Sequence, residues 1–198
     1  MISPQKKKKK ATNEKTLGSL NPKNCFEQQE LFFANDCKVN PVFEYNNLEA
    51  AQKTLQNFNV VNFEHLSLAK SIMDLVLTKF GSESAWLEQF GDVLPQEEIE
   101  TFFNNYIQEN EFQELELNMC QNIASNASTS YDPKTNTHRL NVKTTCNYRR
   151  DWIRGVADHE AGTHYLRRYN EKFQTWMKRE KYEIKSCLIT EEGFAGLN

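Results

Sequence analysis

The chain has 198 residues, 38% of them hydrophobic, a formal net charge of -3 and a pI near 5.9. This size suffices for one domain with a hydrophobic core, and the balanced charge disfavours a general nucleic-acid-binding protein. No stretch approaches the ~18 consecutive apolar residues of a membrane span, and no apolar secretory signal follows the N-terminal lysines, so we expect a cytoplasmic chain without membrane or nucleic-acid partners.

The N-terminal segment is polar and contains five consecutive lysines at positions 6–10. Blocks of like charge are usually solvated, although a basic segment of this kind can also dock on an acidic partner. We therefore predict a disordered basic tail over residues 1–24 and a folded domain over residues 25–198.

Apolar residues recur at helical spacing in four segments of the first half, which are residues 48–58, 66–80, 86–90 and 95–107. Asn46 or Asn47 can cap the first of these helices, and Pro95 suits the first turn of the last. Gly81 follows the second segment, where a left-handed residue commonly ends a helix. The first half is therefore predicted to be mostly helical.

The pattern changes in the second half of the chain. Apolar and polar residues alternate over residues 115–119 and again over 138–142, with a turn-rich segment at 131–136 between them. These two strands predict a small antiparallel sheet. Helical spacing returns over residues 149–169, so the fold is predicted to be α+β and mostly helical, with this last helix at its centre.

The central helix carries the sequence His-Glu-Ala-Gly-Thr-His at residues 159–164. Histidines four residues apart project from one face of a helix, where both can bind zinc while the adjacent glutamate reaches the metal-bound water. Histidines five residues apart diverge by roughly 140° on an ideal α-helix. Convergence of His159 and His164 on one ion therefore requires a local deformation, such as a π-bulge or a widened turn, which Gly162 makes less costly.

These residues predict that His159 and His164 are zinc ligands and that Glu160 is the catalytic group acting on water. The alternative is that both histidines are ordinary polar positions on an amphipathic helix. A catalytic zinc site usually has a third protein ligand, for which Glu191 and Glu192 are the downstream candidates. A helix capped by Thr190 would present one of them inward, although both could simply place negative charge in its first turn.

Three segments resemble a known protein family, and they are residues 40–45, residues 159–167 with Asn170, and residues 191–195. The family comprises metallopeptidases that include eukaryotic microtubule-associated tyrosine carboxypeptidases and bacterial relatives named for a Gln-Glu-Gly-Leu-Ala motif. The resemblance implies a zincin-like metallopeptidase domain with Zn²⁺ held by His159, His164 and Glu192. It also implies that Glu160 is the catalytic acid/base.

The eukaryotic members remove the C-terminal tyrosine of α-tubulin. The resemblance therefore implies the α-tubulin tail or the microtubule as partner, and a location on the cytoskeleton. Glu191 stands where the bacterial motif has Gln, and family members continue beyond the position of Asn198. We therefore expect a domain that is truncated at its C-terminal end.

An exopeptidase of this kind also needs a cation for the terminal carboxylate of its substrate. Arg167 and Arg168 are the predicted candidates, and Arg149 and Arg150 are the other arginines nearby in the sequence. Two other functions stay open. One is a catalytically inactive or truncated family member that binds tubulin or microtubules, and the other is a helical interaction protein with a chance motif and no bound metal.

Overall fold

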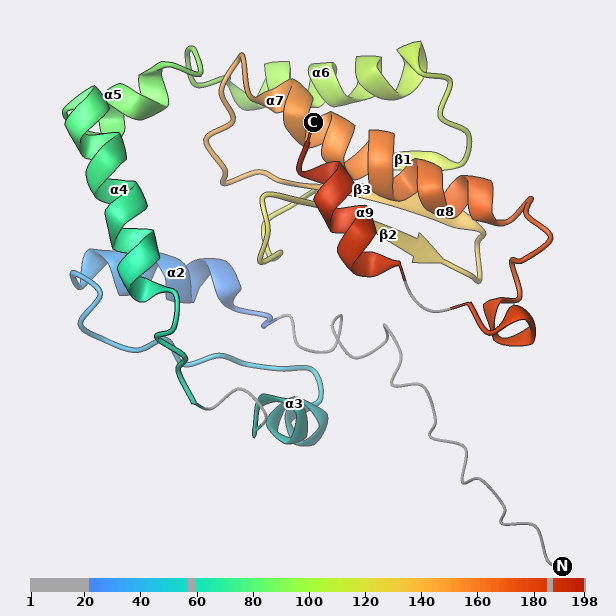
Figure 1. Cartoon of the computed structure of the whole chain (residues 1–198), viewed down its shortest axis with the longest axis horizontal. Helices are drawn as coiled ribbons and strands as arrows, with labels where there is room; N and C mark the ends of the chain where they lie inside the picture. The colour runs from blue at the N-terminus through green and yellow to red at the C-terminus, as the bar shows by residue number, and fades with distance from the viewer. Residues whose placement is uncertain (1–21, 57–59, 185–186, 198) are drawn as a thin grey trace, which may run out of the picture. The chain divides into compact units, whose positions relative to one another are not determined.

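The computed structural model describes residues 22–56, 60–184 and 187–197 (Figure 1). The chain divides into two compact units, Met1–Phe63 and Glu64–Asn198. The lysine run and most of the expected tail lie outside the described residues, so the tail and the domain boundaries stay predictions.

The first unit contains the helix α2 (Cys25–Ala34), which the sequence analysis did not predict. Two amide side chains near its N-terminal end hold the segment 40–45 in place. Asn24 donates from Nδ2 to the carbonyl oxygen of Val42 at 3.0 Å, and the Val42 amide donates to Oε1 of Gln28 at 2.7 Å. The segment of residues 40–45 that resembles the family is therefore fixed beside α2.

The second helix of this unit, α3 (Leu48–Leu55), begins where the sequence predicts. Asn47 is its N-cap, and the Asn47 side chain accepts a hydrogen bond from the amide of Ala50 at 3.0 Å. This contact satisfies one of the amide groups that lack a partner inside the first turn.

The second unit contains most of the helices and all three strands of the described residues. In chain order its elements are α4 (Leu66–Phe80), α5 (Glu83–Glu88), α6 (Gln96–Glu109), β1 (Leu115–Cys120), β2 (Ala127–Asp132), β3 (Thr137–Lys143), α7 (Ile153–Ala157), the π-helix η2 (Asp158–Tyr165), α8 (Leu166–Glu171), the 3-10 helix η3 (Arg179–Tyr182) and α9 (Leu188–Ala195). The predicted α+β class with a majority of helices is confirmed.

The three strands form one mixed sheet in the order β1-β3-β2. β1 runs parallel to β3 and β2 runs antiparallel to it, with Leu117 and Thr129 both opposite Leu140. The prediction of an antiparallel sheet was therefore wrong. The chain between the two predicted strands contains a third strand, β2, which pairs with one edge of β3 and leaves the other edge to β1.

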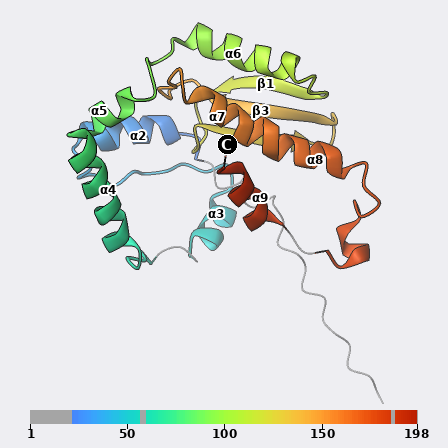
Figure 2. The same cartoon turned by 45° about the horizontal axis from the view of Figure 1, so that its top comes forward.

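The hydrophobic core of this unit lies between α6, the sheet and the helix formed by α7, η2 and α8. These three segments run as one continuous helix alongside the sheet, with α6 in a neighbouring layer (Figures 1 and 2). The core consists of the side chains of Leu94, Ile99, Phe103, Tyr106, Leu115, Leu140, Val142, Tyr148, Ile153, Ala157, Ala161 and Tyr165. The central helix that carries the histidines is thus anchored on its inner face by apolar packing.

The helix α4 has the predicted bounds and ends at Gly81, whose φ is 80° and whose amide donates to Leu77 at 2.8 Å. Its apolar face is solvent-exposed, with Leu68 and Leu75 among the exposed side chains. Among the described residues, no helix is both long and apolar enough to cross a membrane.

Candidate metal centre

The histidines lie on the π-helix η2, which replaces about two turns in the middle of the central helix. A π-helix closes hydrogen bonds between residues five apart, so side chains at that separation come to lie one above the other. Nε2 of His159 is 3.2 Å from Nε2 of His164. The predicted deformation of the helix is confirmed, and it brings together two side chains that an ideal α-helix would separate.

The helix α9 brings two glutamates to these histidines. It begins at Leu188, so Thr190 lies inside its first turn and does not cap it as predicted. Adjacent residues on a helix point about 100° apart, and the two carboxylates accordingly differ in environment. The side chain of Glu191 is 5% exposed, whereas that of Glu192 is 53% exposed.

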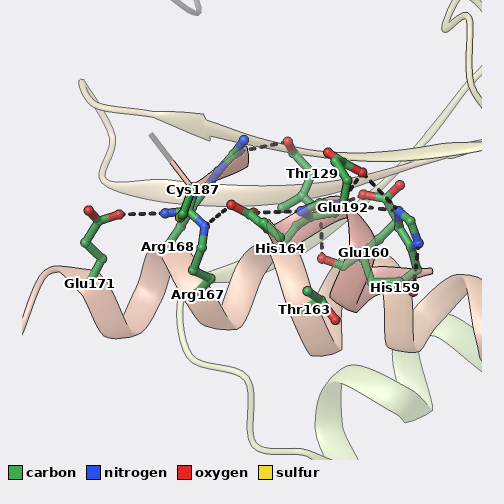
Figure 3. Close-up of polar contacts among 12 residues, drawn as sticks. Thr129, His159, Glu160, Thr163, His164, Arg167, Arg168, Glu171, Cys187 and Glu192 are labelled. Carbon is green, nitrogen blue, oxygen red and sulfur yellow. Dashed lines mark hydrogen bonds and ion pairs between the residues drawn. The ribbon is translucent and has the colours of Figure 1, made fainter. Parts of the chain in front are cut away.

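Three possible metal-donor atoms, one each from His159, His164 and Glu192, converge where α9 meets the π-helix (Figure 3). Oε2 of Glu192 lies 3.5 Å from Nε2 of His164 and 3.9 Å from Nε2 of His159, and all three donor atoms are within 4.8 Å of one another. Zinc binds imidazole nitrogen and carboxylate oxygen at ~2.1 Å, so ligands around one tetrahedral ion are roughly 3.4 Å apart. The donor set and its spacing therefore fit a zinc ion.

Both histidines are held through their other ring nitrogen. Nδ1 of His159 is 3.1 Å from the carbonyl oxygen of Ala195, and Nδ1 of His164 is 2.7 Å from Oε1 of Glu191. Each acceptor favours the tautomer that carries its proton on Nδ1, which leaves the Nε2 lone pair for a metal. The backbone contact of Ala195 carries no signal in the sequence.

Glu191 is held between His164 and Arg167. Burial alone would raise the pKa of the Glu191 carboxyl, but hydrogen bonds from Arg167 and His164 lower it below its usual range. Glu191 is therefore an anion at neutral pH and a strong acceptor for the His164 ring.

Glu160 is oriented by a residue that the sequence analysis missed. Oγ1 of Thr129, on β2, lies 2.9 Å from the carbonyl oxygen of Glu160 and 3.2 Å from its Oε2 (Figure 3). The hydroxyl can donate to either oxygen and thereby limits the motion of the carboxylate. The contact of Thr129 was not predicted because the sequence analysis did not predict the strand β2.

All four candidate arginines have partners. Arg149 donates to the carbonyl oxygen of Gly91 (2.8 Å), Arg150 pairs with Glu98 (3.3 Å), Arg167 pairs with Glu171 (2.7 Å) and with Glu191, and Arg168 donates to the carbonyl oxygen of Thr129 (3.0 Å). The assignment of the substrate carboxylate to Arg167 or Arg168 stays a prediction.

The fold and the donor set define a mostly helical α+β protein in which His159, His164 and Glu192 could hold a metal ion. No family model matches the chain. Curated proteins do match it, among them three that are each aligned over 187 residues and 92% of this chain. The protein named "Putative tyrosine carboxypeptidase MATCAP2" of Mus musculus is 29% identical to this chain. The microtubule-associated tyrosine carboxypeptidase 1 is 29% identical in Mus musculus and 28% identical in Homo sapiens.

The chain is therefore a distant homologue of the microtubule-associated tyrosine carboxypeptidases, as the sequence motifs predicted. It spans between 35% and 39% of the length of these relatives.

Proposed function

We propose that the chain is a zinc-dependent carboxypeptidase that removes a C-terminal tyrosine, with the α-tubulin tail as its substrate on cytoplasmic microtubules. The observation that carries this proposal is the convergence of His159 and His164, which lie with Glu160 on the π-helix, with Glu192 of α9. The names of the relatives, which are tyrosine carboxypeptidases associated with microtubules, support the substrate and the partner.

His159, His164 and Glu192 would hold the metal. When bound, zinc lowers the pKa of a coordinated water to ~7 and polarises the scissile carbonyl. The Nδ1 contacts of both histidines leave the Nε2 lone pairs for this role.

Glu160 is the proton carrier of the reaction. One of its carboxylate oxygens accepts a proton from the attacking water, which forms the new C–O bond at the scissile carbonyl carbon. As the C–N bond breaks, the same carboxylate delivers the proton to the leaving amine nitrogen. The Thr129 hydroxyl keeps the carboxylate aimed through both transfers.

Arg168 is the better placed of the two predicted contacts for the substrate carboxylate. The hydrogen bond from Arg168 goes to a neutral carbonyl on β2, whereas Arg167 is paired with two carboxylates. A guanidinium with a neutral partner can bind a further anion at lower cost than one that must first give up an ion pair.

The test combines zinc analysis with tyrosine release. We expect the purified chain to bind one zinc ion and to release free tyrosine from a peptide that ends in tyrosine, but not from the same peptide with an amidated C-terminus. Glu160→Gln is expected to retain zinc and to release no tyrosine, because Glu160 acts on water and is not a ligand.

The outcomes separate the alternatives. Stoichiometric zinc without turnover on any tyrosine-ending peptide would favour a binding module that keeps the site but lacks catalysis. Absence of stoichiometric zinc would refute the proposal and favour a helical interaction protein that binds no metal.

A further inference from the structure

We infer that Arg167 and Glu171 are positioning residues for the metal centre, which act through Glu191 to hold the ring of His164. This inference rests on the proposed zinc site and gives Arg167 a role other than the substrate contact predicted from the sequence. The side chains of Arg167 and Glu171 contact neither the Nε2 atoms of the two histidines nor the Glu192 carboxylate.

The first link is the carboxylate of Glu191. One of its oxygens, Oε1, is 2.7 Å from Nδ1 of His164, and the other, Oε2, is paired with Nε of Arg167. Because the two oxygens have different partners, the carboxylate cannot rotate without giving up one of them. The position of the His164 acceptor is therefore set by Arg167.

The second link leads away from the metal centre along the central helix (Figure 3). Nη1 of Arg167 donates to Oε2 of Glu171 at 2.7 Å, and the other oxygen of Glu171 pairs with Nε of Arg179. Charges alternate along this row, from Glu191 through Arg167 and Glu171 to Arg179. All four side chains are less than one third exposed, so solvent and salt screen these pairs less than they screen surface ion pairs.

The row also connects three elements. Glu191 lies on α9, Arg167 and Glu171 lie on α8, and Arg179 lies on η3. Since α9 also carries Glu192, the pairing of Glu191 with Arg167 fixes the helix that delivers the third metal donor. The same contact thus orients one histidine and anchors the carboxylate ligand next to it.

Loss of Arg167 alone would leave two adjacent, largely buried carboxylates without their shared cation. A buried carboxylate that loses its cation is costly to keep in place, so the Glu191 side chain would turn towards solvent. This rotation would take the acceptor away from Nδ1 of His164. We therefore expect lower zinc affinity from a substitution that removes no metal donor.

The test compares Arg167→Met, Arg167→Lys and the control Lys172→Met in competition with a zinc chelator. Substitution of a residue behind a metal ligand typically costs 10 to 100-fold in affinity, so the zinc dissociation constant of Arg167→Met is expected to rise by ~10 to 100-fold. Arg167→Lys should recover part of the loss, because it keeps the charge without the two-pronged geometry. Lys172→Met should bind zinc normally, since Lys172 pairs with Glu114 at 2.6 Å, outside the row.

A second measurement uses the zinc-free protein. Nitrogen-15 NMR of the imidazoles should show His164 as the Nδ1–H tautomer in the unsubstituted chain and in Lys172→Met, and a mixture of tautomers in Arg167→Met. A general loss of folding would not shift this equilibrium while leaving the rest of the spectrum intact. If Arg167→Met does not fold, Glu171→Gln replaces it as the test variant, because it keeps the Arg167–Glu191 pair. Glu171→Gln should raise the zinc dissociation constant less than Arg167→Met would.

Normal zinc affinity in Arg167→Met would overturn the inference, and so would an unchanged His164 tautomer. Failure of the unsubstituted chain to bind zinc would instead refute the proposed function, and the NMR comparison would still decide whether Arg167 positions the ring.

Discussion

The substitution Gly162→Ala tests how tightly the π-helix is packed. A Cβ at this position would lie 3.2 Å from the hydroxyl oxygen of Tyr106 and 3.8 Å from Cβ of Asp158. The Tyr106 hydroxyl donates to Asp158, and both burial and this carboxylate raise the pKa of Tyr106, so the hydroxyl stays protonated. The Tyr106 ring belongs to the core, which leaves it little room to move away.

Two opposing effects determine the size of the change. Alanine is favoured over glycine in a helix by ~0.5–1 kcal/mol, because it loses less conformational entropy on folding. Overpacking of a rigid site costs ~1–3 kcal/mol. The contact with Tyr106 should prevail, so the free energy of unfolding of Gly162→Ala should fall by roughly 1 kcal/mol.

A matched control is available on α9. Nothing lies within 4 Å of a Cβ built at Gly193, so Gly193→Ala should gain stability without a steric cost. Its free energy of unfolding is expected to rise by ~0.5–1 kcal/mol. Both variants would be measured by urea denaturation of the zinc-free protein, in the unsubstituted chain and in the Tyr106→Phe background. Removal of the hydroxyl should make Gly162→Ala less destabilising.

If Gly162→Ala stabilised the unsubstituted chain as much as Gly193→Ala does, close packing against Tyr106 could not be what requires glycine in the π-helix. An equal loss with and without the Tyr106 hydroxyl would lead to the same conclusion, because the clash would then have another source.

Three further predictions concern the metal centre. Glu192→Gln should weaken zinc binding by more than ~100-fold and Glu191→Gln by ~10 to 100-fold, since only the first removes a proposed ligand. Zinc titrations of the two variants in parallel would measure this difference. A larger loss in Glu191→Gln would make Glu191 the third ligand in place of Glu192. Thr129→Val should keep zinc but lower kcat for tyrosine release about tenfold, which matches the loss of one hydrogen bond to a charged group worth ~1.5 kcal/mol. An unchanged kcat would show that Thr129 does not orient Glu160. Zinc at 100 times its dissociation constant should stabilise the fold by about 2.7 kcal/mol, and a melting temperature that did not respond to zinc or to EDTA would contradict binding to the folded state.

The local features of the site were predictable because they depend on neighbours in the sequence. The separation of His159 and His164 by five residues required a deformed helix, and the structure contains a π-helix of eight residues there. The divergence of Glu191 and Glu192 followed from helix geometry alone. The roles of these residues as catalyst and ligands stay predictions until metal and activity are measured.

Features that depend on distant pairing were not predictable in the same way. The strand β2 has the sequence Ala-Ser-Thr-Ser-Tyr-Asp, in which small polar residues replace the alternation of apolar side chains that marks a half-buried strand. Because β2 was not predicted, neither the mixed sheet nor the contact of Thr129 with Glu160 could be predicted. The helix α2 was missed as well, and none of its residues is buried, so it shows no clear apolar face.

The π-helix also constrains how the motif can change by insertion and deletion. A π-helical turn holds about one residue more than an α-helical turn, so deletion of Gly162 would leave the histidines four apart, as on an ordinary α-helix, and keep the later residues of the helix close to their present orientation. Tyr165, which is 1% exposed, would then stay in the core, and Arg167 would stay beside Glu191. The five-residue and four-residue spacings of the histidines therefore differ by the one residue that the π-helix accommodates, and a single deletion would be enough to convert the longer motif into the shorter one.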